Sequence, residues 1–132
     1  MRKIKYTAVV MTLLSAAIAN SAPVSTGTDE AMTALATHSG CLTCHSINRA
    51  LPEGTVAKPV GPAWSDVAAK YKDQKGAVQK LTATVMQGSN PYASHWKGKV
   101  TGLAMPPNAV AIHRDEARQL VRWILSLDTG KT

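Results

Sequence analysis

The segment from Cys41 to His45, which reads Cys-Leu-Thr-Cys-His, constrains this chain more than any other part of its sequence. This C-x-x-C-H spacing is the signature of covalent attachment of c-type haem. One turn of helix puts the sulfurs of Cys41 and Cys44 on the same side, within reach of the two vinyl groups of one porphyrin. The adjacent His45 then points its imidazole at the iron. The sequence therefore predicts one haem c, attached through Cys41 and Cys44, with His45 as an iron ligand.

Three other uses of this cysteine pair stay open. Cys41 and Cys44 are the only cysteines in the chain, so an exported protein could oxidise them to a disulfide. A thioredoxin-like redox pair needs a βαβ context, which the sequence does not show. A zinc site needs further ligands at regular spacing, and His38 is the only close candidate. Haem is favoured because the other readings leave the histidine directly after Cys44 unexplained.

The second iron ligand is predicted to be Met105. It lies in a loop just before Pro106 and Pro107, which fix the backbone and hold the thioether in place without a helix. A His45–Met105 pair favours reduced iron and raises the potential, which suits an electron carrier. His95, also in a loop, is the alternative ligand. The other methionines beyond residue 22, Met32 and Met86, fall in expected helices, where packing explains them.

The first 22 residues have the pattern of a secretory signal peptide. Three cations at the start are followed by an apolar run to residue 19 and by small residues, with cleavage after Ala19 or Ala22. A retained membrane anchor is the alternative, but the apolar run is shorter than the ~20 residues that a spanning helix needs. We therefore expect a periplasmic protein with a signal peptide over 1–22, a linker over 23–28 and a cytochrome c domain over 29–132.

The charge of the chain indicates the kind of partner. Loss of the three cations of the leader lowers the formal net charge from +7 to +4. The chain has no dense lysine block and no arginine-rich helix, which argues against nucleic acid and favours redox partner proteins with an acidic docking surface. Either a solvated surface or a set of cations that steers such a partner explains five lysines: Lys58, Lys70, Lys72, Lys97 and Lys99.

Hydrophobic spacing predicts four short helices and no strand. The segments 46–62 and 89–108 are rich in glycine and proline and are expected to be loops. Loops of this length are unusual unless they wrap something, so the expected fold is all-α, with short helices and long loops around one haem. The helices are expected from Glu30 to Ser39 with Asp29 as N-cap, from Trp64 to Tyr71, from Gly76 to Gln87 with Gly88 as the stop, and from Asp115 to Leu127.

Three blocks in this order carry a resemblance to a known family. They cover residues 40–45, around the two cysteines, residues 60–71, which begin Val-Gly-Pro-Ala-Trp, and residues 105–125, which begin Met-Pro-Pro-Asn. From about residue 30 to 127 the chain resembles the small bacterial class I c-type cytochromes, which are periplasmic electron carriers with one haem. The first block alone occurs in many unrelated haem proteins, whereas the three together are specific. The resemblance implies the cytochrome c fold and single-electron transfer.

The resemblance also implies contacts around the haem. The carbonyl of Pro62 would accept a hydrogen bond from the second ring nitrogen of His45 and fix the orientation of the ring. Asn108 would hydrogen-bond near the sulfur of Met105, and Trp96 would donate its indole N–H to a haem propionate. The stretch from Trp96 to Met105 is longer than in the family, and this difference argues against the propionate contact.

The resemblance further implies that the first and last helices cross near Gly40, with Trp123 packed at the crossing. The chain departs from the family in two more places: the segment 45–61 is longer, and two residues, including His113, are added between residues 110 and 115. His38 and His113 are expected to face solvent.

The expected function is that of an electron carrier rather than an enzyme. Both axial positions of the iron would be filled, so no substrate binds there. One alternative is a haem subunit of a larger periplasmic oxidoreductase, which has the same sequence requirements. Another is an enzyme or sensor in which Met105 leaves the iron and a small molecule takes its place.

Overall fold

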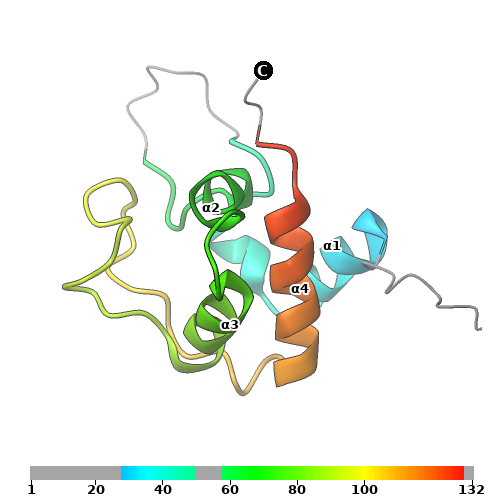
Figure 1. Cartoon of the computed structure of the whole chain (residues 1–132). Helices are drawn as coiled ribbons and strands as arrows, with labels where there is room; N and C mark the ends of the chain where they lie inside the picture. Colours follow the sequence, from blue (N-terminus) through cyan, green and yellow to red (C-terminus); the bar gives the residue numbers. More distant parts are fainter. Residues whose placement is uncertain (1–27, 50–57, 130–132) are drawn as a thin grey trace, which may run out of the picture.

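The computed structural model describes residues 28–49 and 58–129. These residues contain no strand, so the predicted all-α architecture of short helices and long loops is confirmed (Figure 1). Within those two ranges, no helix combines the length and the apolar character needed to cross a membrane. The signal peptide expected over 1–22 lies outside the described residues, as does the linker up to residue 27. The elements are α1 (Asp29–His38), a 3-10 turn (Cys41–Thr43), α2 (Trp64–Tyr71), α3 (Ala77–Gln87) and α4 (Arg114–Ser126).

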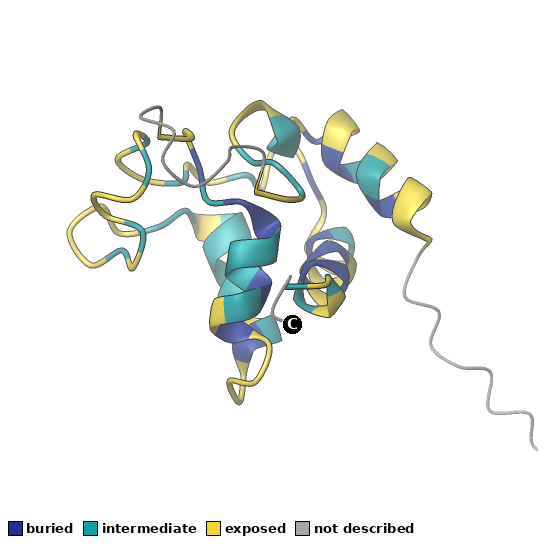
Figure 2. Cartoon of the chain, turned by 90° about the horizontal axis from the view of Figure 1, so that it is seen from above, coloured by how far each residue is buried: buried dark blue, intermediate teal, exposed yellow. Residues whose placement is uncertain are grey.

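Helix α4 is the element against which the other three helices pack. It is strongly amphipathic, because Leu120, Val121 and Ile124 are buried on one face while Arg118 and Arg122 are exposed on the other. Leu120 and Ile124 join Met32 of α1 and Trp64 of α2 in one hydrophobic cluster. Figure 2 shows the buried residues of the helices turned toward this shared centre.

Two tryptophans stand at the centre of this core. The rings of Trp64 and Trp123 meet edge to face, with centroids 5.8 Å apart and planes at 86°. The indole Nε1–H of Trp123 donates to Oδ1 of Asp29 at 2.7 Å, which ties α4 to the first turn of α1. The expected packing of Trp123 is confirmed, but its contact lies at the start of α1.

Helices α1 and α4 pack against each other, as predicted, but Gly40 is exposed and does not form the contact. Among the described residues, and apart from Gly40 and its two neighbours in the chain, no atom lies within 4 Å of the position that a Cβ on Gly40 would take. Gly40 instead has φ +72°, a left-handed conformation that ends α1 and turns the chain into the cysteine segment. Its requirement for glycine is therefore conformational, and no close approach of α4 is involved.

The bounds of α2 are as predicted, and those of α1, α3 and α4 differ from the predicted ones by one residue. Thr28, rather than Asp29, is the N-cap of α1, because its Oγ1 accepts the N–H of Ala31 at 3.3 Å. Asp29 falls in the first turn, where the helix dipole favours its charge. At α4, the side chain of Glu116 accepts the N–H of His113 at 2.9 Å and so starts the helix at residue 114. His113 is exposed, as is His38, in agreement with the prediction.

Candidate functional site

The cysteine segment forms one tight turn. The N–H groups of Cys44 and His45 both donate to the carbonyl of Cys41, at 3.3 and 3.1 Å. Both thiols are free, with Cys41 partly buried and Cys44 exposed. Burial raises the pKa of the Cys41 thiol, and a backbone hydrogen bond partly offsets this effect. In the described ranges, no three or more histidine, cysteine, aspartate or glutamate side chains come together in a group that could hold a metal ion such as zinc.

The imidazole of His45 is held from two sides. Its Nδ1 lies 2.8 Å from the carbonyl oxygen of Pro62, so the predicted hydrogen bond between these residues is present. Because a carbonyl only accepts, Nδ1 carries the hydrogen and Nε2 keeps its lone pair. The ring also stacks on Trp64, with centroids 5.9 Å apart and planes at 25°. Burial lowers the pKa of His45, against the opposing effect of the Pro62 hydrogen bond, so the neutral ring is favoured.

This arrangement requires a glycine at position 61, because the surrounding atoms leave no room for a side chain there. Its N–H donates to the carbonyl of Cys44 at 2.8 Å. A Cβ at this position would stand 2.9 Å from Cε1 of His45 and 3.0 Å from the backbone oxygen of Cys44. The glycine therefore lets the segment before Pro62 press against the cysteine turn, and this brings the Pro62 carbonyl to the imidazole.

Met105 is positioned by the residues that follow α3. The N–H of Met105 donates to Oγ of Ser89, and the N–H of Ser89 donates to the carbonyl of Met105, both at 2.9 Å. Gly88, the predicted stop of α3, has φ +82°, and a Cβ there would stand 2.8 Å from the Met105 carbonyl. The Met105 side chain is partly buried. The sequence did not indicate this role of Ser89, because no local pattern around a serine that follows a helix points to a partner 16 residues away.

Asn108 pins the same loop to α3. Its backbone N–H donates to the carbonyl of Val85 at 3.0 Å, and its Nδ2 lies 3.3 Å from that oxygen and 2.7 Å from the carbonyl of Pro106. In the described structure the side-chain amide of Asn108 thus donates its hydrogen bonds to backbone carbonyls. The hydrogen bond expected near the Met105 sulfur is not among these contacts and stays a prediction.

Trp96 lies in a loop that crosses back over an earlier segment. Its indole ring meets His95 edge to face at 4.8 Å, and Nζ of Lys99 lies 5.7 Å from the ring centroid. The N–H groups of Thr101 and Gly102 donate to the carbonyls of Pro59 and Val60, both at 2.9 Å. These bonds link the Trp96 loop to the segment that leads into Gly61 and Pro62. The expected role of Trp96 toward a propionate stays a prediction.

The walls of the site suit a large apolar ring. Half-buried apolar side chains of the cysteine turn, of the segment after it, and of α2 and α3 pack against the core. Surface of this kind gains from being covered by a macrocycle. The donor set also fits haem, because it offers two thiols one turn apart, a neutral imidazole and a thioether. The half-buried side chains are Leu42, Ile47, Val67, Val85 and Met86.

Comparison with known proteins gives the same assignment. A family model described as Cytochrome c matches residues 29–128. The chain is 44% identical to cytochrome c2 of Rhodocyclus tenuis over 94 residues, which cover 71% of this chain and 89% of that protein. It is 40% identical to cytochrome c-551 of Pseudomonas aeruginosa over 87 residues, which cover 66% of this chain and 67% of that protein. The crystal structure of wild-type cytochrome c552 from Nitrosomonas europaea matches with a TM-score of 0.55 at 34% identity, over 71% of this chain and 96% of that one.

Proposed function

This chain belongs to the cytochrome c family, and we propose that it carries single electrons in the periplasm on a haem whose iron lies between His45 and Met105. Members of the family bind haem c covalently through cysteine, and the cysteines of this chain with the required spacing are Cys41 and Cys44. The haem supplies the one-electron chemistry, because its iron is stable in the ferrous and the ferric state. The chain supplies the ligands, their orientation and a dry environment.

The hydrogen bond between His45 and Pro62 is the observation that carries the proposal. It fixes the tautomer that leaves Nε2 unprotonated, and it fixes the plane of the ring. The stacked Trp64 and the close approach of Gly61 prevent the ring from turning. His45 directly follows Cys44, so a porphyrin bound at the two sulfurs would have this nitrogen at its face.

Met105 is proposed as the ligand on the opposite face. Its backbone is held by two hydrogen bonds to Ser89 and is followed by two prolines, so the chain itself fixes where this backbone lies. A thioether opposite an imidazole favours the ferrous state and raises the reduction potential. If His45 and Met105 both bind the iron, no open site would remain for a substrate, which favours a carrier over a sensor.

The periplasmic location rests on the leader pattern of residues 1–22, a basic start followed by an apolar run and small residues. A haem subunit of a larger periplasmic oxidoreductase would use the same ligands. Purification of the protein from its native periplasm separates these two roles. A free carrier elutes alone, at the size of one small domain, and a subunit elutes with a larger chain.

Replacement of Met105 by leucine tests the ligand assignment. In the oxidised protein we expect the weak far-red band of sulfur-to-iron ligation, and we expect Met105→Leu to abolish it while the haem stays attached. The reduced variant should also bind carbon monoxide, which the unchanged protein should not. Met86→Leu is the matched control and should keep the band. A band that survives in Met105→Leu would remove this residue as the ligand.

A further inference from the structure

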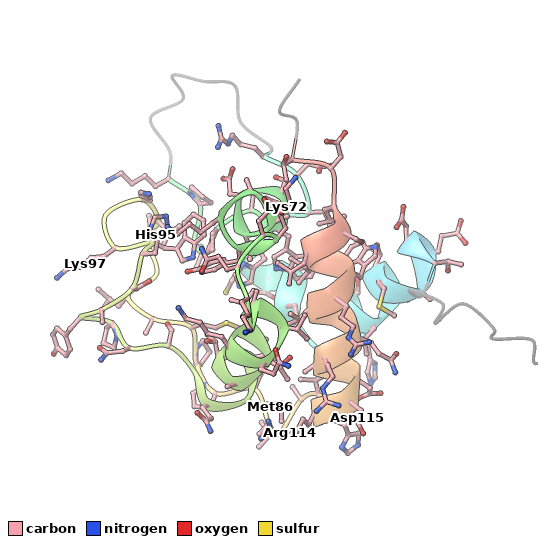
Figure 3. All side chains as sticks on the ribbon, in the orientation of Figure 1. Lys72, Met86, His95, Lys97, Arg114 and Asp115 are labelled. Atoms are coloured by element: carbon pink, nitrogen blue, oxygen red, sulfur yellow. The ribbon has the colours of Figure 1, made fainter. Side chains whose placement is uncertain are left out.

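Two loops that are far apart in the sequence are tied together by hydrogen bonds. The loop of residues 94–104 leads into Met105, and residues 58–60 lead toward Pro62. Figure 3 shows the first of these loops, on which His95 is labelled, at the side of the molecule away from α1 and α4. The four hydrogen bonds that join the loop to residues 58–60 are called the strap below.

Three bonds of the strap come from Thr101 and Gly102. Their N–H groups donate to the carbonyls of Pro59 and Val60, both at 2.9 Å, and Oγ1 of Thr101 also donates to the carbonyl of Pro59 at 3.3 Å. A Cβ on Gly102 would stand 2.6 Å from the carbonyl oxygen of Val60. Gly102 is not among the glycines with positive φ, so this position needs glycine for the close approach and not for its conformation.

The fourth bond comes from the opposite side. Nζ of Lys58 donates to the carbonyl of Gly98 at 2.7 Å. The N–H groups of Lys97 and Lys99, in contrast, donate to carbonyls inside the loop, so these bonds shape the loop without attaching it to another segment. The strap therefore attaches the loop to residues 58–60.

Residues 58–60 are a firm base for the strap, because the two residues after them are bound to the cysteine turn. The N–H of Gly61 donates to the carbonyl of Cys44 at 2.8 Å. The carbonyl of Pro62 accepts the Nδ1–H of His45 at 2.8 Å. The strap thus connects the loop to the segment that orients the imidazole.

Met105 depends on the strap for support along the chain that precedes it. Ser89 binds the backbone of Met105 itself, but Leu103 and Ala104, which separate Met105 from Gly102, are both exposed, Leu103 at 86%. Exposed side chains contribute little packing that could hold their backbone. Three residue steps span at most about 11 Å, so a fixed Gly102 limits how far Met105 can move.

We propose that the strap couples the two iron ligands: it ties the loop before Met105 to the segment that holds His45, and so keeps Met105 on the iron. The proposal rests on the His45–Met105 ligation proposed above. Thr101 and Gly102 are then positioning residues for Met105. Opening of the strap would raise the fraction of molecules in which Met105 has left the iron. A small ligand that binds only this fraction would gain apparent affinity in proportion.

The test measures cyanide binding to the ferric, haem-loaded protein. Gly102→Ala forces the two segments of the strap apart, and we expect cyanide to bind about tenfold more tightly to this variant. Gly76→Ala is the control, because Gly76 has φ +79° and open space around its Cβ position, so alanine adds strain away from both loops. Its cyanide affinity should stay within about twofold of that of the unchanged protein. An unchanged affinity in Gly102→Ala would overturn the proposal.

A milder pair of variants leaves the backbone in place. Lys58→Met and Lys97→Met each remove one positive charge from an exposed side chain, but only Lys58 takes part in the strap. Because both variants alter the attraction of the anion in the same direction, their difference reports the strap bond. We expect cyanide to bind about threefold more tightly to Lys58→Met than to Lys97→Met. Equal affinities in this pair would also contradict the coupling.

Amide hydrogen exchange in the reduced, haem-loaded protein gives a readout that does not involve cyanide. Gly102→Ala should speed exchange of the Met105 N–H about fivefold and leave the N–H of Val121 in α4 unchanged. An equal rise at both positions would show a global loss of stability and would overturn the local coupling. The far-red band separates the two proposals. Its absence from the unchanged protein would refute ligation by Met105, whereas its presence with unaltered exchange in Gly102→Ala would refute the strap alone.

Discussion

The carbonyl oxygen of Pro62 accepts the Nδ1–H of His45 at 2.8 Å, across 17 residues of chain. This bond joins the cysteine turn to the segment before α2, and it selects the ring tautomer that can bind iron through Nε2. The two residues meet because Gly61 between them has no side chain. The orientation of the proposed iron ligand is thus determined by backbone packing.

The substitution Gly61→Ala tests this dependence. The new Cβ would stand 2.9 Å from the ring of His45 and 3.0 Å from the backbone oxygen of Cys44, so the segment must move. We expect a loss of about 1–3 kcal/mol in the free energy of unfolding, measured by urea titration, because backbone cannot give way as a side chain can. The far-red band should weaken as well, because the ring turns with its partner.

Gly76→Ala provides the comparison for this variant. Gly76 has φ +79° but open space around its Cβ position, so alanine there adds strain of about 1 kcal/mol without touching the site. Its spectrum should match that of the unchanged protein. If Gly61→Ala also leaves the spectrum and the stability unchanged, packing at Gly61 does not orient His45.

The hydrogen bond between Trp123 and Asp29 joins residues 94 positions apart at 2.7 Å. Asp29→Ala leaves the partly buried indole N–H without its acceptor, and we expect a loss of about 2 kcal/mol in urea unfolding. Asp29→Asn keeps an acceptor and should recover most of this loss. Glu30→Ala, in the same turn, removes a charge without this bond and should cost under about 0.5 kcal/mol. Equal losses for Asp29→Ala and Glu30→Ala would assign the effect to the helix dipole.

Ser89 is expected to control how firmly Met105 holds its place. Ser89→Ala removes the Oγ that accepts the Met105 N–H at 2.9 Å, and the opposite bond from Ser89 N–H remains. Loss of about 1 kcal/mol of loop stability should let cyanide replace Met105 on the ferric iron with roughly fivefold tighter apparent affinity. Ser94→Ala removes the acceptor for the Trp96 N–H instead and should leave cyanide affinity unchanged. Identical cyanide affinities for the two variants would contradict the role of Ser89.

The titration of His95 reports the charges around it. Desolvation, Lys70 and Lys99 lower the pKa of His95, so Lys99→Ala should raise it toward the ordinary value of about 6.5, as followed by NMR of the ring proton. A lowered pKa means that the unfolded chain binds this proton more readily. The contribution of His95 to stability is therefore present above its unfolded pKa and is lost as pH falls below it. Lys80→Ala, on α3, is the control and should leave the His95 titration in place.

Much of the fold could be predicted because its signals are local. The C-x-x-C-H segment, the spacing of apolar residues in α2 and α4, and the glycine that ends α3 each depend on a few neighbouring residues. The Pro62 contact was expected from the resemblance alone, and the structure contains it. Asp29 was predicted as the N-cap of α1, but the neighbouring Thr28 is an equally good cap and takes that place. Gly40 was predicted at a close contact between helices, but a glycine also suits a left-handed turn, which is its role here.

The features that could not be predicted connect distant segments without a pattern in either one. No spacing indicates that Ser89 binds Met105, that Trp123 reaches Asp29, or that Thr101 and Gly102 pair with the residues before Gly61. Each contact depends on how the long loops return to the helices. The contact of Lys58 with the carbonyl of Gly98, 40 residues away, belongs to the same class.

The intact mass of the protein purified from its native compartment shows whether the haem is covalently attached. We expect a chain that begins after Ala19 or Ala22 and carries the mass of one haem, which persists under denaturing conditions because thioether bonds at Cys41 and Cys44 hold it. A colourless protein with the mass of the bare processed chain would contradict the covalent haem and every role derived from it.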